Sequence, residues 1–203
     1  MDDLILKNNE AAAAYKADRR GFLKHGLLFT AALGFWTPAL APGLAMADED
    51  DEPIAKKGRT MHFTNLHTQE SFKGEYWYDG EYIPEAFSDI KTVLRDYRTG
   101  DKFPIDPRLM DILYVVQRRL DNFTPFNVFS GYRSPHTNAM LRETTNGVAR
   151  GSLHMQGQAI DINLPGTSLN SLHRAGIRLK SGGVGYYPSS DFVHVDTGRV
   201  RNW

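Results

Sequence analysis

The chain is organised around two segments, GSLHMQGQAID at residues 151–161 and DFVHVD at residues 191–196. Together they supply two imidazoles and a carboxylate, on His154, His194 and Asp161. A catalytic zinc ion is usually held by three protein ligands of these kinds and keeps its fourth position for water, whereas a structural zinc ion is closed by four ligands. We therefore predict that these three side chains bind one zinc ion (Zn²⁺).

The composition excludes several other kinds of site. The 203 residues include no cysteine, so neither a thiolate zinc site nor thiol catalysis is available. Lys and Arg number 24, as do Asp and Glu, so no net positive charge draws the protein to nucleic acid or to an anionic membrane. The length suits one domain with a substantial core. We expect binding to depend on a local site, with no nucleic-acid partner.

The first 47 residues are predicted to be an export signal rather than part of the domain. Arg19-Arg20 precede a moderately apolar stretch at residues 26–36, and Ala45-Met46-Ala47 is a small-x-small cleavage pattern. This arrangement resembles a twin-arginine signal, although Asp18 stands where such signals usually carry Ser or Thr. Because the apolar run is shorter than the roughly 20 residues that span a bilayer, a permanent anchor is the weaker alternative. We predict export by the twin-arginine (Tat) machinery into the periplasm, followed by cleavage of residues 1–47 and no lasting membrane span.

The rest of the chain is predicted to be a linker followed by one domain. Residues 48–58 begin with an acidic block that has nothing to bury, which predicts a flexible linker. Residues 59–203 then carry the patterns of a folded domain. Aromatic and β-branched residues predict strands, the first two forming a hairpin, over 60–65, 71–78, 126–129, 158–163, 184–187 and 192–196. Start signals and apolar residues at three- and four-residue steps predict helices from Pro84 and from Pro107 to Leu120. Two further helices are expected over 136–142 and 167–177.

Alternation within two of these strands supports the same site. Ile160 and Ile162 share one face of their strand, so Asp161 points to the other face, toward the segment that carries His154. His194 and Asp196 share a face of the last predicted strand. A carboxylate directed from a strand toward the preceding loop that carries His154 can close a metal site.

Arg133 lies where the strand at 126–129 runs into the segment SGYRSP at residues 130–135. A strand that ends in Gly and is followed by Ser-Pro turns sharply and presents side chains at the edge of the sheet. Arg133 therefore either belongs to the site or forms an ordinary surface salt bridge, and the pattern favours neither alternative.

The sequence assigns no site role to some other imidazole and aromatic side chains. His62 and His67 fall in or near the predicted hairpin without another ligand at metal-binding spacing, so we predict that they are surface histidines of strands. Tyr186 and Tyr187 follow a glycine turn and either line a substrate groove or pack in the core.

Two sets of motifs resemble known zinc peptidases. The pattern Ser152-x-His154-x-x-Gly157-x-Ala159-x-Asp161 with a late histidine resembles the D-Ala-D-Ala dipeptidases and carboxypeptidases, whose fold also occurs in the amino-terminal Hedgehog domain. The segments SGYRS, GVGYYP and FVHVDTG, at residues 130–134, 183–188 and 192–198, resemble the YcbK-like murein endopeptidases, also called MepK. The resemblance covers about residues 59–203. It implies an α+β fold of the Hedgehog/DD-peptidase kind, a small, mostly antiparallel sheet flanked by helices.

The resemblance also implies roles for individual residues. It assigns zinc binding to the two imidazoles and the carboxylate named above, and it assigns Arg133 to gripping the substrate carbonyl or the developing oxyanion. The base stays open. The dipeptidases carry an acid, usually Glu, three residues before the last histidine, where this chain has Asp191, whereas the YcbK-like branch carries an acid two residues after it, here Asp196. Asp196 is either the base or the residue that orients His194 from behind.

The activity that the resemblance implies is zinc-assisted hydrolysis of the peptide cross-links of peptidoglycan. Zinc lowers the pKa of its water toward about 7, and a nearby carboxylate then acts as the base. One alternative is a catalytically silent peptidoglycan-binding module, since Hedgehog domains largely keep the site without a known peptidase role. Another is a D,D- or L,D-carboxypeptidase that trims stem peptides. An intact Arg133 and an acid near His194 favour the endopeptidase.

Overall fold

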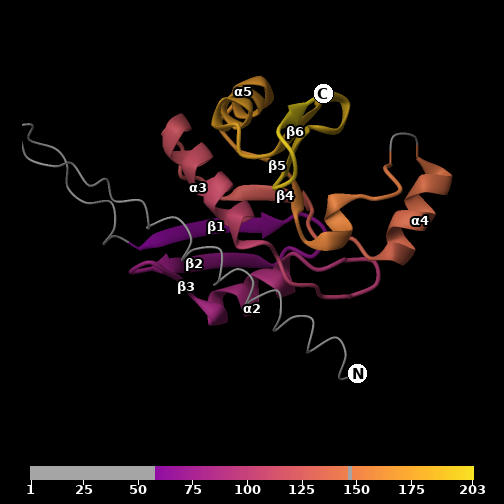
Figure 1. Ribbon diagram of the computed structural model, residues 1–203, viewed down its shortest axis with the longest axis horizontal. Helices are drawn as coiled ribbons and strands as arrows, with labels where there is room; N and C mark the ends of the chain where they lie inside the picture. Colours follow the sequence, from indigo (N-terminus) through magenta and orange to yellow (C-terminus); the bar gives the residue numbers. More distant parts are fainter. Residues whose placement is uncertain (1–57, 146–147) are drawn as a thin grey trace, which may run out of the picture. The chain divides into compact units, whose positions relative to one another are not determined.

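The computed structural model describes residues 58–145 and 148–203 (Figure 1). The predicted signal at residues 1–47 and all of the predicted linker except Gly58 lie outside the described residues, so both stay predictions. Within the described ranges, no helix is both long and apolar enough to cross a membrane.

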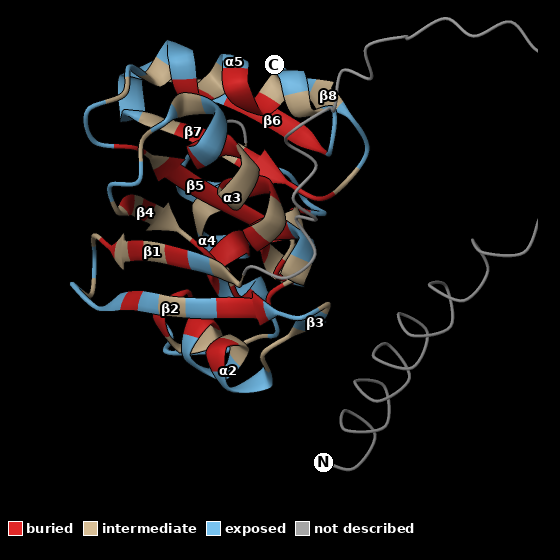
Figure 2. Cartoon of the chain, turned by 90° about the vertical axis from the view of Figure 1, so that its left-hand side faces the viewer, coloured by how far each residue is buried: buried red, intermediate tan, exposed pale blue. Residues whose placement is uncertain are grey.

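The described strands form one eight-stranded sheet in the order β3-β2-β1-β4-β5-β7-β6-β8. Figure 2 shows this order, from β2 and β3 near the bottom to β6 and β8 near the top. Only the pairs β1–β4 and β6–β8 are parallel; the other neighbours in the sheet are antiparallel. The strands are β1 (Arg59–Asn65), β2 (Ser71–Tyr78), β3 (Glu81–Tyr82), β4 (Phe126–Ser130), β5 (Ala159–Asn163), β6 (Gly183–Tyr187), β7 (Phe192–Asp196) and β8 (Arg201–Asn202).

The α+β class and the mostly antiparallel sheet are confirmed, but the sheet is larger than the small sheet that we predicted. The six predicted strands all form, and the two that the sequence did not predict, β3 and β8, lie at the two edges. Each has only two residues. A two-residue strand has no alternation to detect, because it exists only through hydrogen bonds to the neighbour that it pairs with.

The predicted helices are confirmed, and their local start signals explain them. The helices are α2 (Pro84–Val93), α3 (Pro107–Leu120), α4 (Pro135–Thr144) and α5 (Leu169–Leu179). Proline stands in the first turn of α2, α3 and α4, where its missing N–H costs nothing. The side chains that precede α3, α4 and α5, Asp106, Ser134 and Ser168, each accept a hydrogen bond from a backbone N–H of the first turn.

The central strands separate a helix-covered core from the face that carries the site. Ile160 and Ile162 of β5 and Val193 of β7 are fully buried and belong to the same hydrophobic core as the inner residues of α2, α3 and α5. Alternation therefore sends the residues between them, Asp161 and His194, to the opposite face. Figure 2 shows the buried residues concentrated along these central strands.

Candidate metal centre

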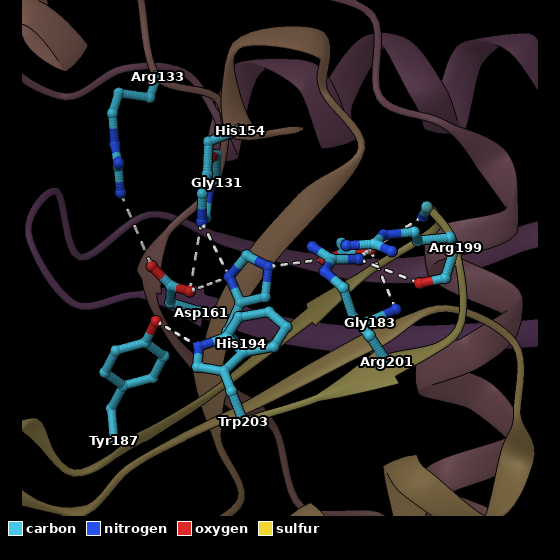
Figure 3. A network of polar contacts seen from close by, with 12 residues as sticks. Gly131, Arg133, His154, Asp161, Gly183, Tyr187, His194, Arg199, Arg201 and Trp203 are labelled. Carbon is cyan, nitrogen blue, oxygen red and sulfur yellow. Dashed lines mark hydrogen bonds and ion pairs between the residues drawn. The ribbon is translucent and has the colours of Figure 1, made fainter. Parts of the chain in front are cut away.

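The structure brings the three predicted ligands together (Figure 3). His154 Nε2 lies 3.2 Å from His194 Nδ1 and 3.3 Å from Asp161 Oδ1, and His194 Nδ1 lies 2.9 Å from the same oxygen. A tetrahedral zinc ion with bonds of about 2.0–2.1 Å separates its ligand atoms by about 3.3 Å. Two nitrogens and one oxygen at these separations fit one such ion, and no described residue has to move far to hold it.

The sheet register places two of these ligands directly opposite each other. Asp161 of β5 pairs with His194 of β7 in the antiparallel ladder, where the side chains of opposed residues are about 5 Å apart. His154 comes from η2 (Leu153–Gln156), a short 3₁₀ helix. Its Nδ1 lies 2.7 Å from the carbonyl oxygen of Gly131. That contact is satisfied when Nδ1 carries the proton, which leaves Nε2 unprotonated toward the other two ligands.

Asp196 holds the ring of His194 in the orientation that directs Nδ1 toward His154 and Asp161. His194 Nε2 lies 3.0 Å from Asp196 Oδ2, so Nδ1 faces the ligand cluster. Asp196 is fully buried and also accepts hydrogen bonds from the backbone N–H groups of Gly183 and Gly198, at 3.0 and 2.9 Å. Arg201 donates to both of its oxygens, at 2.7 and 3.1 Å. These contacts occupy the acceptor positions of the carboxylate and tie the ring of His194 to the backbone.

Asp191 lies on the same face of the sheet as the ligands. It follows the short 3₁₀ helix η3 (Pro188–Ser190), is exposed, and accepts a 2.9 Å hydrogen bond from Asn163 Nδ2 through Oδ2. Asn163 is two residues beyond Asp161 on β5, so both side chains point to that face. Oδ1 of Asp191 has no hydrogen-bond partner among the described residues. The two acids thus differ in geometry: Asp196 is locked behind His194, whereas Asp191 keeps one oxygen that no described residue engages.

Arg133 lies at the site. Its side chain is 14% exposed, and its Nη2 is 3.9 Å from Asp161 Oδ2. Its backbone N–H donates to the carbonyl oxygen of His154, and its Nη1 donates to Asn138 Oδ1 at 3.5 Å. Burial lowers the pKa of Arg133 below its ordinary value, the charge of Asp161 opposes this, and the charge of Arg98 adds to it. Arg133 is thus largely buried beside Asp161, and its role there stays a prediction.

The ligand cluster carries strongly shifted pKa values. Burial would raise the pKa of Asp161, but the charges and hydrogen bonds of His154 and His194 hold it well below its usual range. Burial would lower the pKa of His194, but its hydrogen bonds to Asp161 and Asp196 raise it to about 9. At neutral pH the metal-free cluster therefore holds a proton on His194 between two carboxylates.

Zinc is expected to bind the metal-free protein more tightly as the pH rises from 7 to 9. Metal ligands must be deprotonated, and the proton on His194, whose pKa is about 9, has to leave. The apparent affinity should rise about tenfold per pH unit in this window. Competition with a chromophoric chelator at pH 7, 8 and 9, corrected for the chelator's own protonation, measures it. An affinity that does not change with pH would contradict the proton assignment.

The same proton makes the stability of the metal-free fold depend on pH with the opposite sign. The folded-state pKa of His194, about 9, lies above the unfolded value of about 6.5. Its contribution to stability is therefore complete below about pH 6.5 and is lost as the pH rises through about 9.

An aromatic wall of Trp203 and Tyr187 closes one side of the site; a lining position for Tyr187 was one of the two predicted alternatives, whereas Trp203 was not predicted. The ring of Trp203 lies 5.3 Å from that of His194, and its Nε1 donates a 2.8 Å hydrogen bond to the hydroxyl of Tyr187 (Figure 3). Gly185 of β6 pairs with His194, and a Cβ at that position would lie 2.6 Å from Trp203 Cε2. The indole of Trp203 thus occupies the space that a side chain at position 185 would fill. Tyr187 lines the cleft beside the ligands, whereas Tyr186 is exposed.

The ligands lie in the wall of an open cleft of about 800 Å³. His67 lines this cleft from the turn after β1, so the prediction of a strand position was wrong, while His62 does lie on β1. The imidazole of His67 stacks on Tyr97 with ring centroids 3.7 Å apart. Arg98, next to Tyr97, lines the cleft as well. No periodic pattern marks these residues, because they come from turns.

A steric constraint explains why the last position of the His-x-x-Gly motif is a glycine. Gly157 ends η2 with φ of 63°, and a Cβ there would lie 2.0 Å from the carbonyl oxygen of Pro104. Gly157→Ala is expected to lower the free energy of unfolding by about 2–6 kcal/mol, because a left-handed alanine and a displaced backbone each cost about 1–3 kcal/mol. Gly100→Ala is the matched control, since Gly100 has φ of 79° but nothing within 4 Å of its Cβ position. Urea unfolding of both variants should show the larger loss for Gly157→Ala; equal losses would contradict the steric account.

Comparison with known proteins assigns the chain to a family. The family model described as "Peptidoglycan L,D-endopeptidase MepK" matches residues 53–203. The peptidoglycan L,D-endopeptidase MepK of Escherichia coli K12 is 39% identical over 189 residues, which are 93% of this chain and 98% of that protein. The probable peptidoglycan L,D-endopeptidase MepK of Haemophilus influenzae is 39% identical over 148 residues, which are 72% of this chain and 80% of that protein. The chain, with its His, Asp and His ligand cluster, therefore belongs to the MepK family of peptidases.

Proposed function

We propose that this protein is a zinc-dependent peptidoglycan L,D-endopeptidase that hydrolyses peptide cross-links in the periplasm. The observation that carries the proposal is the convergence of His154, Asp161 and His194 in the wall of an open cleft, with Arg133 beside them. The names of the relatives supply the substrate. Export by the twin-arginine machinery and kinship with the Hedgehog/DD-peptidase fold belong to the same proposal.

The donor set suits zinc and the hydrolysis of an amide. A zinc ion held by the three ligands would supply a Lewis acid that polarises the scissile carbonyl and lowers the pKa of water. Arg133 lies next to Asp161, with donors that can stabilise negative charge as it develops on the carbonyl oxygen. Burial of its guanidinium strengthens this interaction, because less water screens it.

The two aspartates take different roles in this proposal. Asp191 acts as the base, since Asn163 holds one of its oxygens and leaves Oδ1 to accept a proton from the attacking water. The same oxygen then returns the proton to the leaving amine. Asp196, whose acceptor positions are all engaged, keeps Nδ1 of His194 directed at the ligand cluster.

Digestion of isolated sacculi tests the proposal. Purified protein loaded with zinc should release cross-linked muropeptides as monomers, and a chelator should stop the release until zinc is restored. Product formation that the chelator does not affect would overturn the zinc proposal. Binding to sacculi without cleavage would indicate a silent binding module, and consumption of monomers alone would indicate a carboxypeptidase.

A further inference from the structure

The cleft carries more positive charge than hydrolysis of a neutral amide requires. Arg98, Arg133 and Arg201 all line it, and Asp161 is the only carboxylate among its described lining residues. Arg201 is neutralised by Asp196, to which it donates two hydrogen bonds. Asp161 is engaged by the two histidines of the ligand cluster. Two guanidinium groups therefore face the cleft without full neutralisation: Arg98 has no ion pair among the described residues, and Arg133 has only the 3.9 Å contact with Asp161, which both histidines also engage.

Arg98 is held at the cleft by its neighbours. Its guanidinium carbon lies 4.3 Å from the centre of the Tyr97 ring, and the other neighbour of that ring is His67. His67 is fixed in turn, since its Nε2 lies 3.0 Å from the carbonyl oxygen of Phe129. No carboxylate of the described residues lies within ion-pair distance of the Arg98 guanidinium. The stack of His67, Tyr97 and Arg98 thus holds the Arg98 guanidinium at the cleft, where no described carboxylate neutralises its charge.

A buried carboxylate joins the two backbone segments that carry these arginines. Asp96 is 2% exposed, and its Oδ1 accepts a 3.0 Å hydrogen bond from the backbone N–H of Arg98. Its Oδ2 accepts a 2.9 Å hydrogen bond from the backbone N–H of Ser134, the residue after Arg133. Burial would raise the pKa of Asp96, but these and other hydrogen bonds to its carboxylate lower it, so the carboxylate stays charged. One side chain thereby sets the distance between the two guanidinium-bearing segments.

The two guanidinium groups line one cleft, and Asp96 joins the backbone segments that carry them. Like charges held near each other repel, and an anion placed between them removes that repulsion. A carboxylate suits such a position, because its two oxygens accept paired N–H donors from a guanidinium group.

We propose that Arg98 and Arg133 together bind a free carboxylate of the substrate beside the scissile amide, and that Arg98 sets the preference for peptides that carry one. This inference rests on the proposed peptidase function. It assigns Arg98 to substrate recognition and leaves the bond-breaking step to the residues of the metal centre.

A pair of synthetic cross-linked peptides tests this assignment. The two peptides are identical except that the residue at the scissile amide carries a free carboxylate in one and a primary amide in the other. The wild-type protein should cut the carboxylate peptide with a kcat/KM about tenfold higher, as expected of a charge-assisted contact that is partly exposed. Arg98→Gln should reduce this ratio to less than about twofold, mainly through KM, and Arg98→Lys should restore part of it.

The matched control is Arg178→Gln, an exposed arginine of α5 that does not line the cleft. It should keep the wild-type ratio, and all variants should keep their zinc content. Calorimetric binding of the same two peptides makes the inference testable even in protein without turnover. A wild-type protein that cuts neither peptide would overturn the proposed function, whereas a carboxylate preference that survives in Arg98→Gln, in cleavage or in binding, would overturn the inference.

Discussion

His154→Ala is expected to lose zinc and to lower kcat by about three to four powers of ten. His154 Nε2 is one of three ligand atoms that lie within 4.8 Å of one another, and its ring is 3% exposed, so no other described side chain can take its place without rearrangement. A metal ion that polarises a carbonyl and activates water contributes several kcal/mol to the reaction, and each 1.36 kcal/mol is a factor of ten in rate. Metal analysis of the purified variant and turnover of muropeptide dimers measure the two effects.

His136→Ala is the matched control for this change. His136 is an exposed histidine of α4 that belongs to no group of metal-binding side chains in the described ranges, so zinc content and turnover should stay at the wild-type level. A His154→Ala protein that retains full turnover without metal would refute the zinc mechanism. Loss of activity in both variants would point to damage of the fold rather than of the site.

Asp191→Asn is expected to lower kcat by about 10²- to 10⁴-fold while zinc stays bound. An amide keeps the shape of the carboxylate and its contact with Asn163 but cannot accept the proton from water. General-base catalysis typically contributes a factor of this size. Since Asp191 is exposed and contacts no ligand of the cluster in the described structure, the metal content should not change.

Asp196→Asn should have the complementary effect. The change removes charge from a residue that hydrogen bonds His194, two backbone N–H groups and Arg201. Loss of such a supporting contact typically weakens metal binding by about 10- to 100-fold. Turnover should then recover largely at saturating zinc, whereas that of Asp191→Asn should not. The reverse outcome, in which Asp196→Asn binds zinc normally and does not turn over, would make Asp196 the base.

The elements that could be predicted from the sequence are those with local signals. The helix α3 follows the Asp106-Pro107 start signal, which acts within one turn. The alternation in β5 and β7 separates Asp161 and His194 from the buried apolar residues that flank them, whichever strands they pair with. Donor chemistry is equally local, so the residue types at 154, 161 and 194 already indicate a nitrogen- and oxygen-ligated metal.

The parts that could not be predicted depend on contacts between distant segments. The strand β8 and the position of Trp203 depend on pairing with β6. The stack of Arg98 on Tyr97 depends on a turn that packs beside the loop after β4. The difference between Asp191 and Asp196 has the same origin. Their carboxylates are chemically identical, and only the tertiary partners of each decide which oxygens are engaged.

Local signals along the chain specify the helices, the longer strands and the set of donor atoms, because propensity, alternation and side-chain chemistry act within a few residues. Only the folded arrangement turns Nδ1 of His194 toward Asp161, places Arg133 beside Asp161 and directs a second guanidinium into the cleft. Such orientations and charge balances depend on hydrogen bonds and ion pairs between strands and loops that are far apart in sequence. No periodic pattern along the chain encodes those contacts.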